Sequence, residues 1–183
     1  LIFTNLPIDL TELQPAHFRI DGKVRILVGM RSELILSKGT DTLLKAAQLL
    51  EKEMPGRVEV VNVRDMPWRN YKEELKRAHI VLDQLYSYSP GMNALSAMAL
   101  GRVTGTGAQP EYYDYLGEES RPLFELAPAP AEEIAGRLKT LIADEEKMAG
   151  MGAGGRAIVE RHNDVRIVAD RYLEHWENIL NRK

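Results

Sequence analysis

The chain contains no cysteine among its 183 residues. That absence excludes disulfide bonds, thiolate metal ligands and cysteine nucleophiles, and it is compatible with the reducing environment of a cytoplasm. No apolar run approaches the roughly 20 residues that a membrane-spanning helix needs, and the N-terminus lacks the charged-then-apolar pattern of a secretory signal. We therefore expect a cytoplasmic protein that is soluble or peripheral to the membrane.

Long basic runs and metal-binding patterns are also missing. The 27 acidic and 24 basic residues give a formal charge of -3, and no run of Lys and Arg is long enough to follow a nucleic-acid backbone. The four histidines show no metal-ligand spacing. Only His79 falls in an expected strand, where a packed and hydrogen-bonded ring is the expected role. We therefore expect neither a nucleic-acid polymer as partner nor a metal site.

Several catalytic motifs are absent as well. The chain has no G-x-S-x-G elbow and no Walker lysine motif, which argues against an α/β-hydrolase and a phosphate-loop nucleotidase. Gly105 and Gly107 lack the third glycine of a dinucleotide fingerprint, so a nicotinamide dehydrogenase is disfavoured. A flavodoxin-like regulator with a phosphoacceptor aspartate is disfavoured too, because Asp83 is expected inside a strand and no acidic pair accompanies it.

Apolar residues make up 44% of the chain, which is ample for a core. Continuous apolar runs alternate with apolar residues at helical spacing, and the pattern predicts a doubly wound α/β fold with a mainly parallel, Rossmann-like sheet, helices on both faces and a helical C-terminal region. The expected strands are 24–28, 58–63, 79–85, 102–105 and 122–126, and the expected central helices are 43–54, 71–77 and 90–100.

The C-terminal third is expected to be helical. One apolar stripe lies within 134–142 and a second within 165–179, and both are predicted to pack in the core. Four glycines between 150 and 155 interrupt the pattern and predict a loop or a weakened helix. We divide the chain into a connecting segment (1–22), a Rossmann-like domain (23–162) and a C-terminal helix (163–183) that would project toward a missing partner domain. The first residues resemble a connection within a longer protein.

Ligands of doubly wound sheets bind beyond the carboxyl ends of the strands, where the winding reverses. After the first strand come Gly29, Met30 and Arg31, and Lys38-Gly39 follows at the entry to a helix. An arginine fork and a lysine charge at one strand-to-helix junction suit a diphosphate. The alternative is an ordinary solvated loop, because surface Arg and Lys are common.

A second cluster, Ser89-Pro90-Gly91, stands between an expected strand and an expected helix. The serine is predicted to cap the helix and the proline to lie in its first turn. The helix start, with the amides of Gly91, Met92 and Asn93, would form a phosphate cradle. An ordinary capped helix is the alternative. A third cluster, residues 105–111, is predicted to be a flexible turn that ends in the carboxylate of Glu111, with no clean helix opening there.

Taken in this order, the clusters resemble the C-terminal, nucleotide-sugar-binding domain of retaining GT-B glycosyltransferases of the group 1 type. Asn5 to Leu10 is similar to the inter-domain connection of that family, and Leu27 to Arg31 with Lys38-Gly39 is similar to its V-G-R followed by K-G. Leu95 to Gly101 (LSAMALG) resembles L-E-A-M-A-x-G, and Gly107 to Glu111 (GAQPE) resembles G-G-x-x-E. The likeness spans nearly the whole chain.

The resemblance implies a bacterial, cytoplasmic transferase that binds a nucleoside-diphosphate sugar as co-substrate and uses no cofactor and no metal. Arg31 and Lys38 would contact the donor diphosphate next to Gly29, the amides from Gly91 to Asn93 would cradle it, and Glu111 would close the site. The missing partner would be an N-terminal acceptor domain. Peripheral membrane association of the full-length protein is a further possibility that the resemblance raises.

Two departures from the family pattern matter. The family carries two glutamates eight positions apart around the helix, the first near the transferred sugar and the second on the nucleotide ribose; here the two positions hold Tyr88 and Ser96. A serine offers one hydrogen bond where a carboxylate offers two charged oxygens, so weaker or altered donor binding is implied. The segment between Val63 and His79 is also short, which makes Trp68 a candidate for stacking on the base; the alternative is a tryptophan that shields a helix end.

The leading hypothesis is the donor-binding half of a glycosyltransferase that acts with retention of anomeric configuration. Stabilisation of the departing diphosphate would be mainly electrostatic, and the isolated domain is expected to bind nucleotide without turnover. The competing hypothesis is a non-catalytic module of the same fold that binds a nucleotide sugar or a protein partner, and Tyr88 and Ser96 favour it.

Overall fold

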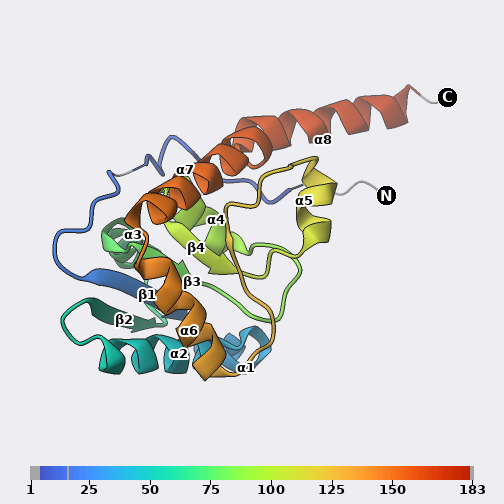
Figure 1. Cartoon of the computed structure of the whole chain (residues 1–183). Helices are drawn as coiled ribbons and strands as arrows, with labels where there is room; N and C mark the ends of the chain where they lie inside the picture. The colour runs from blue at the N-terminus through green and yellow to red at the C-terminus, as the bar shows by residue number, and fades with distance from the viewer. Residues whose placement is uncertain (1–4, 16, 182–183) are drawn as a thin grey trace.

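The computed structural model describes residues 5–15 and 17–181. Its centre is a five-stranded parallel sheet with helices on both faces (Figure 1). The strands are β1 (Val24–Met30), β2 (Val58–Arg64), β3 (Ile80–Leu82), β4 (Val103–Thr106) and β5 (Phe124–Glu125), in the spatial order β2-β1-β3-β4-β5. The predicted doubly wound α/β fold is confirmed.

The winding of the sheet reverses beside β1. β1 pairs in parallel with β2 on one side, from Val24 opposite Val58 to Met30 opposite Arg64, and with β3 on the other side. The chain therefore leaves β1 toward one edge of the sheet and returns to continue toward the other edge. The carboxyl ends of β1 and β3 flank the crevice where doubly wound folds bind ligands.

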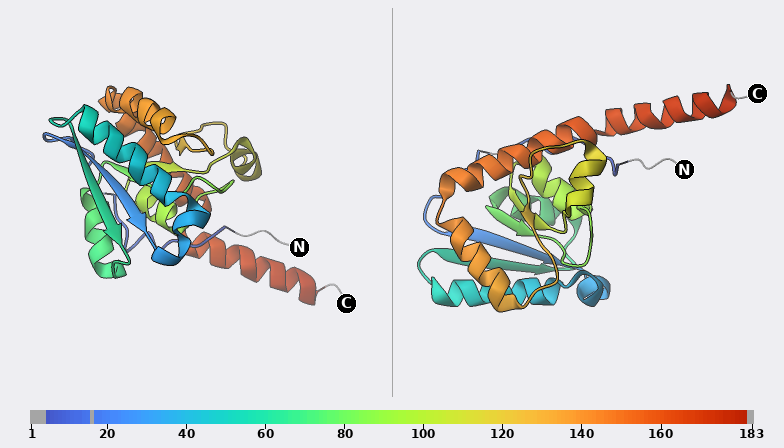
Figure 2. Two further views of the ribbon diagram at one scale, coloured as in Figure 1. Left: turned by 90° about the horizontal axis from the view of Figure 1, so that it is seen from below. Right: turned by 45° about the vertical axis from the view of Figure 1, so that its right-hand side comes forward.

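Helices cover the two faces of the sheet in two layers (Figure 2). Ile26 and Val28 belong to a core that β1 shares with α2 and α6, whereas Leu27 points to the opposite core with α3, α4 and α7. Alternate residues of β1 are thus buried on opposite faces. The helical elements are a 3-10 turn (Ser32–Leu34), α1 (Ile35–Lys38), α2 (Thr40–Glu53), α3 (Trp68–Arg77), α4 (Met92–Ala99), α5 (Pro110–Leu116), α6 (Ala131–Ile142), α7 (Glu145–His162) and α8 (Val165–Leu180).

The strand expected over 79–85 is shorter than predicted, because β3 ends at Leu82. Asp83 therefore lies directly at the carboxyl end of the strand and not inside it. His79 precedes the strand, and its ring accepts a hydrogen bond from the Arg25 amide (2.8 Å) and contacts the Arg19 carbonyl oxygen (2.9 Å). This contact set confirms the packed, hydrogen-bonded role predicted for His79.

Helix α7 runs without interruption through the glycine-rich segment that was expected to be a loop or a weakened helix. A Cβ atom on Gly152 would lie 2.3 Å from the carbonyl oxygen of Gly101, and one on Gly154 would lie 2.5 Å from the Pro122 side chain. The glycines therefore let α7 approach neighbouring backbone closely. Helix packing outweighs the low intrinsic helix propensity of these residues.

The two apolar stripes of the C-terminal third have different outcomes. The stripe of α6 is buried, as predicted, through Ile134, Leu138, Leu141 and Ile142. The stripe of α8 is not, because only Val168 is buried and the helix extends beyond the body of the domain (Figures 1 and 2). Ile167 is half-buried, and the exposed large apolar side chains of α8 are Val165, Tyr172, Leu173, Trp176, Ile179 and Leu180. Among the described residues, no helix has the length and apolar character to cross a membrane.

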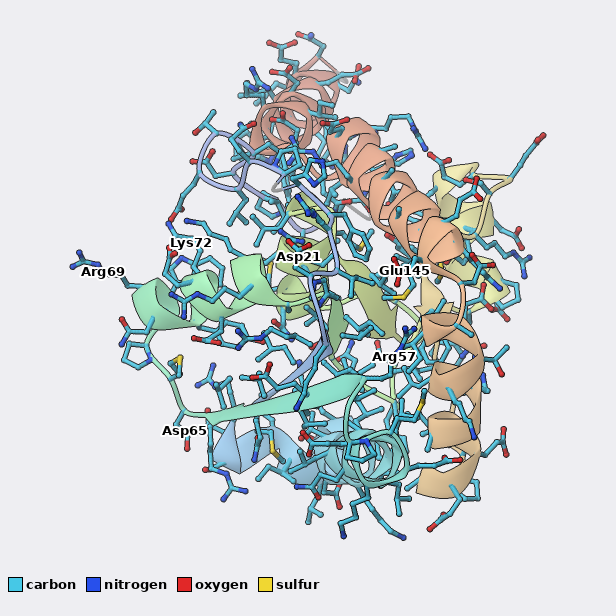
Figure 3. All side chains as sticks on the ribbon, turned by 60° about the vertical axis from the view of Figure 1, so that its left-hand side comes forward. Asp21, Arg57, Asp65, Arg69, Lys72 and Glu145 are labelled. Carbon is cyan, nitrogen blue, oxygen red and sulfur yellow. The ribbon has the colours of Figure 1, made fainter. Side chains whose placement is uncertain are left out.

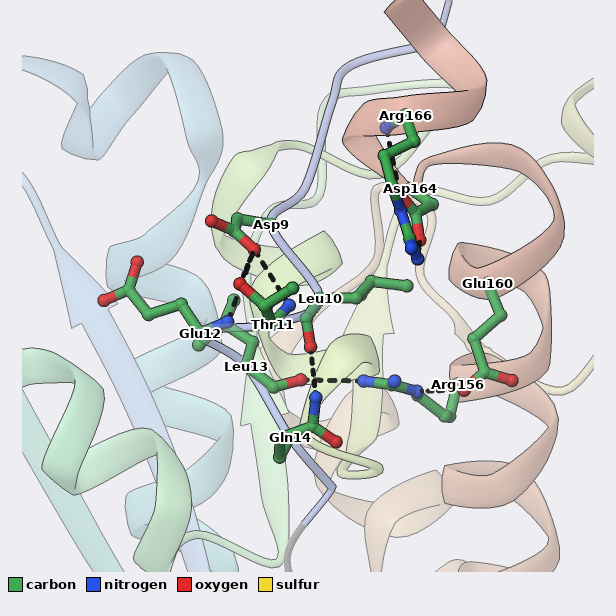
Figure 4. Close-up of polar contacts among 10 residues, drawn as sticks. All are labelled: Asp9, Leu10, Thr11, Glu12, Leu13, Gln14, Arg156, Glu160, Asp164 and Arg166. Carbon is green, nitrogen blue, oxygen red and sulfur yellow. Dashed lines mark hydrogen bonds and ion pairs between the residues drawn. The ribbon is translucent and has the colours of Figure 1, made fainter.

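The N-terminal segment packs along the start of α8 and the end of α7 (Figure 4). The Ile8 amide donates to the Asn163 carbonyl oxygen (2.7 Å), and the Arg156 guanidinium donates to the Leu13 carbonyl oxygen (2.7 Å). Ile8 and Leu13 are buried in the core with α4. These contacts hold the segment beside the carboxyl ends of the strands. The parts of the predicted terminal segments at 1–4, 16 and 182–183 lie outside the described residues.

Candidate functional site

A cavity of about 720 Å³ opens at the carboxyl ends of β1 and β3. Its walls come from the N-terminal segment, the loops after β1, β2 and β3, and the first turns of α4; Figure 3 shows Asp65 at the end of β2, next to the start of α3. The lining residues are Pro7, Ile8, Asp9, Glu12, Leu13, Gly29, Met30, Arg31, Leu34, Lys38, Val63, Asp65, Met66, Trp68, Tyr71, Asp83, Met92, Asn93 and Ser96. The cavity therefore contains both predicted cations and, of the predicted helix start, Met92 and Asn93 but not Gly91.

The start of α4 differs in detail from the prediction. The N-cap is Gly91 and makes no side-chain capping bond, so Ser89 does not cap the helix and Pro90 precedes it. The Ser89 amide donates instead to the hydroxyl of Ser87 (3.3 Å), in a local turn. The first amides of a helix have no intrahelical partner. Because a glycine N-cap offers them no side-chain acceptor, the amides of Met92 and Asn93 suit an anion.

Lys38 and Arg31 both line the cavity, but their side chains differ in exposure and in ion-pair partner. Lys38 is the last residue of α1, before Gly39 in the left-handed region (φ 67°), and its carbonyl oxygen accepts from the Leu85 amide (2.8 Å). Its Nζ lies 3.2 Å from Asp83 Oδ1. Arg31 is mostly exposed and forms an ion pair with Glu33 at 2.5 Å. Lys38 is thus partly buried and paired with a buried carboxylate, whereas Arg31 lies at the rim.

Asp83 is the functional candidate that sequence reasoning missed. It is 1% exposed, and its Oδ1 accepts hydrogen bonds from Lys38 Nζ and from Asn93 Nδ2 (3.3 Å). The Asn93 Oδ1 in turn accepts from the Tyr71 hydroxyl (2.7 Å). A polar chain therefore links Tyr71, Asn93, Asp83 and Lys38. Burial, and then the negative charge of Asp83, raise the pKa of Tyr71, so its hydroxyl remains a donor at neutral pH.

Asp65 organises the outer wall of the cavity. It adopts a left-handed backbone conformation (φ 48°), and its carboxylate accepts from the amide (2.9 Å) and the hydroxyl of Ser32. These hydrogen bonds lower the pKa of Asp65, the hydroxyl having the largest effect. The turn between β2 and α3 is thereby tied to the loop after β1. In the described parts of the chain, no group of three or more His, Asp or Glu side chains could hold a metal ion.

Ser96 and Trp68 also line this cavity. Ser96 is buried, and its hydroxyl donates to the Met92 carbonyl oxygen (2.8 Å) within α4. Its oxygen therefore remains available mainly as an acceptor. Trp68 is the first residue of α3 and is about half exposed, with its ring centroid 6.4 Å from that of Tyr71. An aromatic face is thus present on the wall that the loop after β2 forms.

Tyr88 and Glu111 do not line the main cavity. They line a second one of about 400 Å³, together with Ser89, Pro90 and Tyr112 among others. The structure therefore separates these two residues from Lys38. The predicted flexible turn also differs, since Pro110 begins α5 as its first residue. Gly107 is needed for close approach, because a Cβ atom there would lie 1.8 Å from the Ser87 carbonyl oxygen.

The fold that carries this cavity also occurs in solved structures of other proteins. No protein-family model matches the sequence, and no curated protein is similar enough in sequence to match. Solved structures do match. Sucrose-phosphate synthase from Thermosynechococcus elongatus superposes with a TM-score of 0.71 and 17% identity over 97% of this chain and 52% of that chain. S. aureus TarM, solved as a mutant in complex with Fondaparinux, alpha-GlcNAc-glycerol and UDP, gives 0.68 and 13% over 88% of this chain and 36% of that chain.

A match of similar length to this chain comes from Francisella tularensis. The C-terminal domain of the glycosyl transferase group 1 family protein LpcC gives a TM-score of 0.59 and 22% identity, over 84% of this chain and 96% of that domain. The chain thus spans about a third to a half of the longer proteins and nearly all of this isolated domain. The predicted resemblance is confirmed at the level of the fold: this chain has the architecture of the C-terminal domain of group 1 GT-B glycosyltransferases.

Proposed function

We propose that this chain is the donor-binding half of a glycosyltransferase that transfers a sugar from a nucleoside-diphosphate sugar to an acceptor with retention. The observation that carries the proposal is the convergence of Lys38, Arg31 and the open start of α4 on one cavity where the winding of the sheet reverses. Three solved relatives of the same fold are described as complexes with UDP, which makes UDP the nucleotide to test first.

The mechanism we propose is electrostatic. Negative charge accumulates on the departing diphosphate as the bond to the sugar breaks. The ammonium of Lys38, the guanidinium of Arg31 and the amides of Met92 and Asn93 would stabilise this charge, and removing one such preorganised donor commonly costs a few kcal/mol. Trp68 would stack on the base, and the buried oxygen of Ser96 would accept a hydrogen bond from a ribose hydroxyl. Acceptor binding would come from an N-terminal domain.

Calorimetry with UDP tests donor binding. Arg31→Gln and Lys38→Gln should each weaken the affinity about tenfold or more, because each removes a charge-assisted hydrogen bond of about 1.5–3 kcal/mol. Lys45→Gln is the matched control, since Lys45 pairs with Glu132 away from the cavity. Thermal unfolding checks that each variant folds. Lys38→Gln removes the ion-pair partner of the buried Asp83 and could destabilise the domain. Arg31 is exposed, so Arg31→Gln should leave the fold intact and still test the site.

Binding of UDP to the wild-type chain that neither variant weakens would contradict the proposed site. Absence of binding at millimolar nucleoside diphosphate would favour the second candidate, a module of the same fold without sugar-transfer activity. The observation that favours this candidate is the identity of Tyr88 and Ser96 at the positions of the two family glutamates. For the longer protein, the anomeric configuration of the product, read by NMR, tests retention.

A further inference from the structure

The ion pair between the partly buried Lys38 and the buried Asp83 has a consequence for ligand selection. Asp83 Oδ1 lies 3.2 Å from Lys38 Nζ, and Oδ2 has no hydrogen-bond partner in the described part of the chain. Oδ2 faces the turn before α4, 3.2 Å from where a Cβ atom on Gly91 would lie. A carboxylate thus lies between the main cation of the cavity and the helix start that would hold a phosphate.

The distance between this carboxylate and a bound phosphate follows from the geometry of the ammonium group. A phosphate oxygen on Lys38 Nζ would lie about 3 Å from the nitrogen, like Asp83 Oδ1. Two acceptors on a tetrahedral nitrogen are then about 5 Å apart. Because Asp83 is only 1% exposed, water and salt screen the repulsion weakly. After burial, the negative charge of Asp83 is the second cause of the raised pKa of Tyr71 on the same wall.

The donor and the nucleotide product differ in charge at that position. The terminal phosphate of a nucleoside-diphosphate sugar is esterified and carries one negative charge. After transfer it is a free terminal phosphate with a second ionisable oxygen, and it carries close to two charges at neutral pH because its second pKa is about 6. A fixed negative charge about 5 Å away therefore opposes the product more strongly than the donor.

Building on the proposed function, we propose that Asp83 is a specificity-determining residue that disfavours the free nucleoside diphosphate relative to the nucleoside-diphosphate sugar. Lys38 attracts the diphosphate of both ligands. The Asp83 carboxylate repels the terminal phosphate, and it repels the doubly charged phosphate of the product more than the singly charged phosphate of the donor. The pair thereby promotes release of the product. A carboxylate that only held Lys38 in place would affect both ligands alike.

Calorimetry on the chain with UDP and with UDP-glucose tests this inference. Asp83→Asn keeps the shape and an acceptor for Lys38 and removes the charge, so the affinity for UDP should rise at least threefold more than the affinity for UDP-glucose. Asp83→Ser, which is also neutral, should shift the ratio in the same direction. Asp164→Asn is the matched control, because Asp164 is a buried, ion-paired aspartate outside the cavity, and its ratio should equal that of the wild type.

An unchanged ratio in both Asp83 variants, or an equal loss of both affinities, would overturn the inference and leave Asp83 as a support for Lys38. This result differs from failure of the proposed function, in which the wild-type chain binds neither ligand and both proposals fall. Thermal unfolding of each variant identifies any general loss of the fold.

Discussion

Replacement of Gly29 by alanine should disturb the wall of the cavity through Tyr71. A Cβ atom at position 29 would lie 2.2 Å from the Tyr71 hydroxyl oxygen and 2.8 Å from its Cζ, well inside van der Waals contact. The ring would have to rotate away. Its hydrogen bond to Asn93 Oδ1, now 2.7 Å long, would then break.

The magnitude follows from three contributions. Overpacking of a tight site costs about 1–3 kcal/mol, and the broken hydrogen bond adds about 0.5–1.5 kcal/mol. Alanine loses less backbone entropy than glycine on folding, because its unfolded backbone is less free, and this offsets about 0.5–1 kcal/mol. The free energy of unfolding of Gly29→Ala should therefore fall by about 0.5–4 kcal/mol, and Tm should fall by about 2–4 °C for each kcal/mol.

Urea unfolding followed by circular dichroism checks the cause with a double-mutant cycle. In a Tyr71→Leu background the obstructing atoms are gone, so Gly29→Ala should cost little, with a coupling of about 1–3 kcal/mol between the two positions. Gly136→Ala is the control, because nothing lies within 4 Å of a Cβ atom there and alanine favours the α6 helix. Equal destabilisation by Gly29→Ala in both backgrounds would refute the reasoning.

Three further predictions follow from other contacts. Gly107→Ala should lower Tm more than Gly29→Ala does, because it meets the carbonyl oxygen of Ser87 and not a side chain. Burial lowers the pKa of His79, so its contribution to stability is present above the unfolded-state pKa of about 6.5 and is lost as pH falls below that value; thermal unfolding of His79→Gln should vary less with pH in this window. Glu33→Gln should free Arg31 and strengthen UDP binding about two- to fivefold by calorimetry, whereas unchanged affinity would remove Arg31 from the site.

Much of the fold was predictable because its signals are local. The apolar run of β1 and the stripe of α6 each indicate one element, and both lie in the core. The boundaries of β3 were harder to place, since Asp83 and Gln84 sit within an apolar run. Because aspartate is disfavoured in strands, Asp83 itself indicated that the strand ends at Leu82.

Several of the failures have a different cause, because local patterns do not record how segments distant in the chain pack together. The glycines of α7 reflect the approach of that helix to Gly101, which no local pattern records. The apolar residues of α8 have the same spacing as those of a buried helix, but the spacing does not indicate whether another part of the chain packs against them. The hydrogen-bond partners of Asp83 come from α1 and α4, so its burial and its ion pair could be recognised only in the folded structure.

The charges in the main cavity explain how a weakly acidic site could bind a diphosphate. Its lining has four carboxylates and two cations. Asp9 is engaged with Thr11, Glu12 with Lys72 and Asp65 with Ser32, each partly or fully exposed to solvent. Water and salt screen such rim charges strongly. By contrast, Lys38 is partly buried, and its partner Asp83 is buried beside the start of α4. Recognition of a diphosphate in this chain would therefore depend on a few short contacts at the switch point of the sheet, and not on the net charge of the domain.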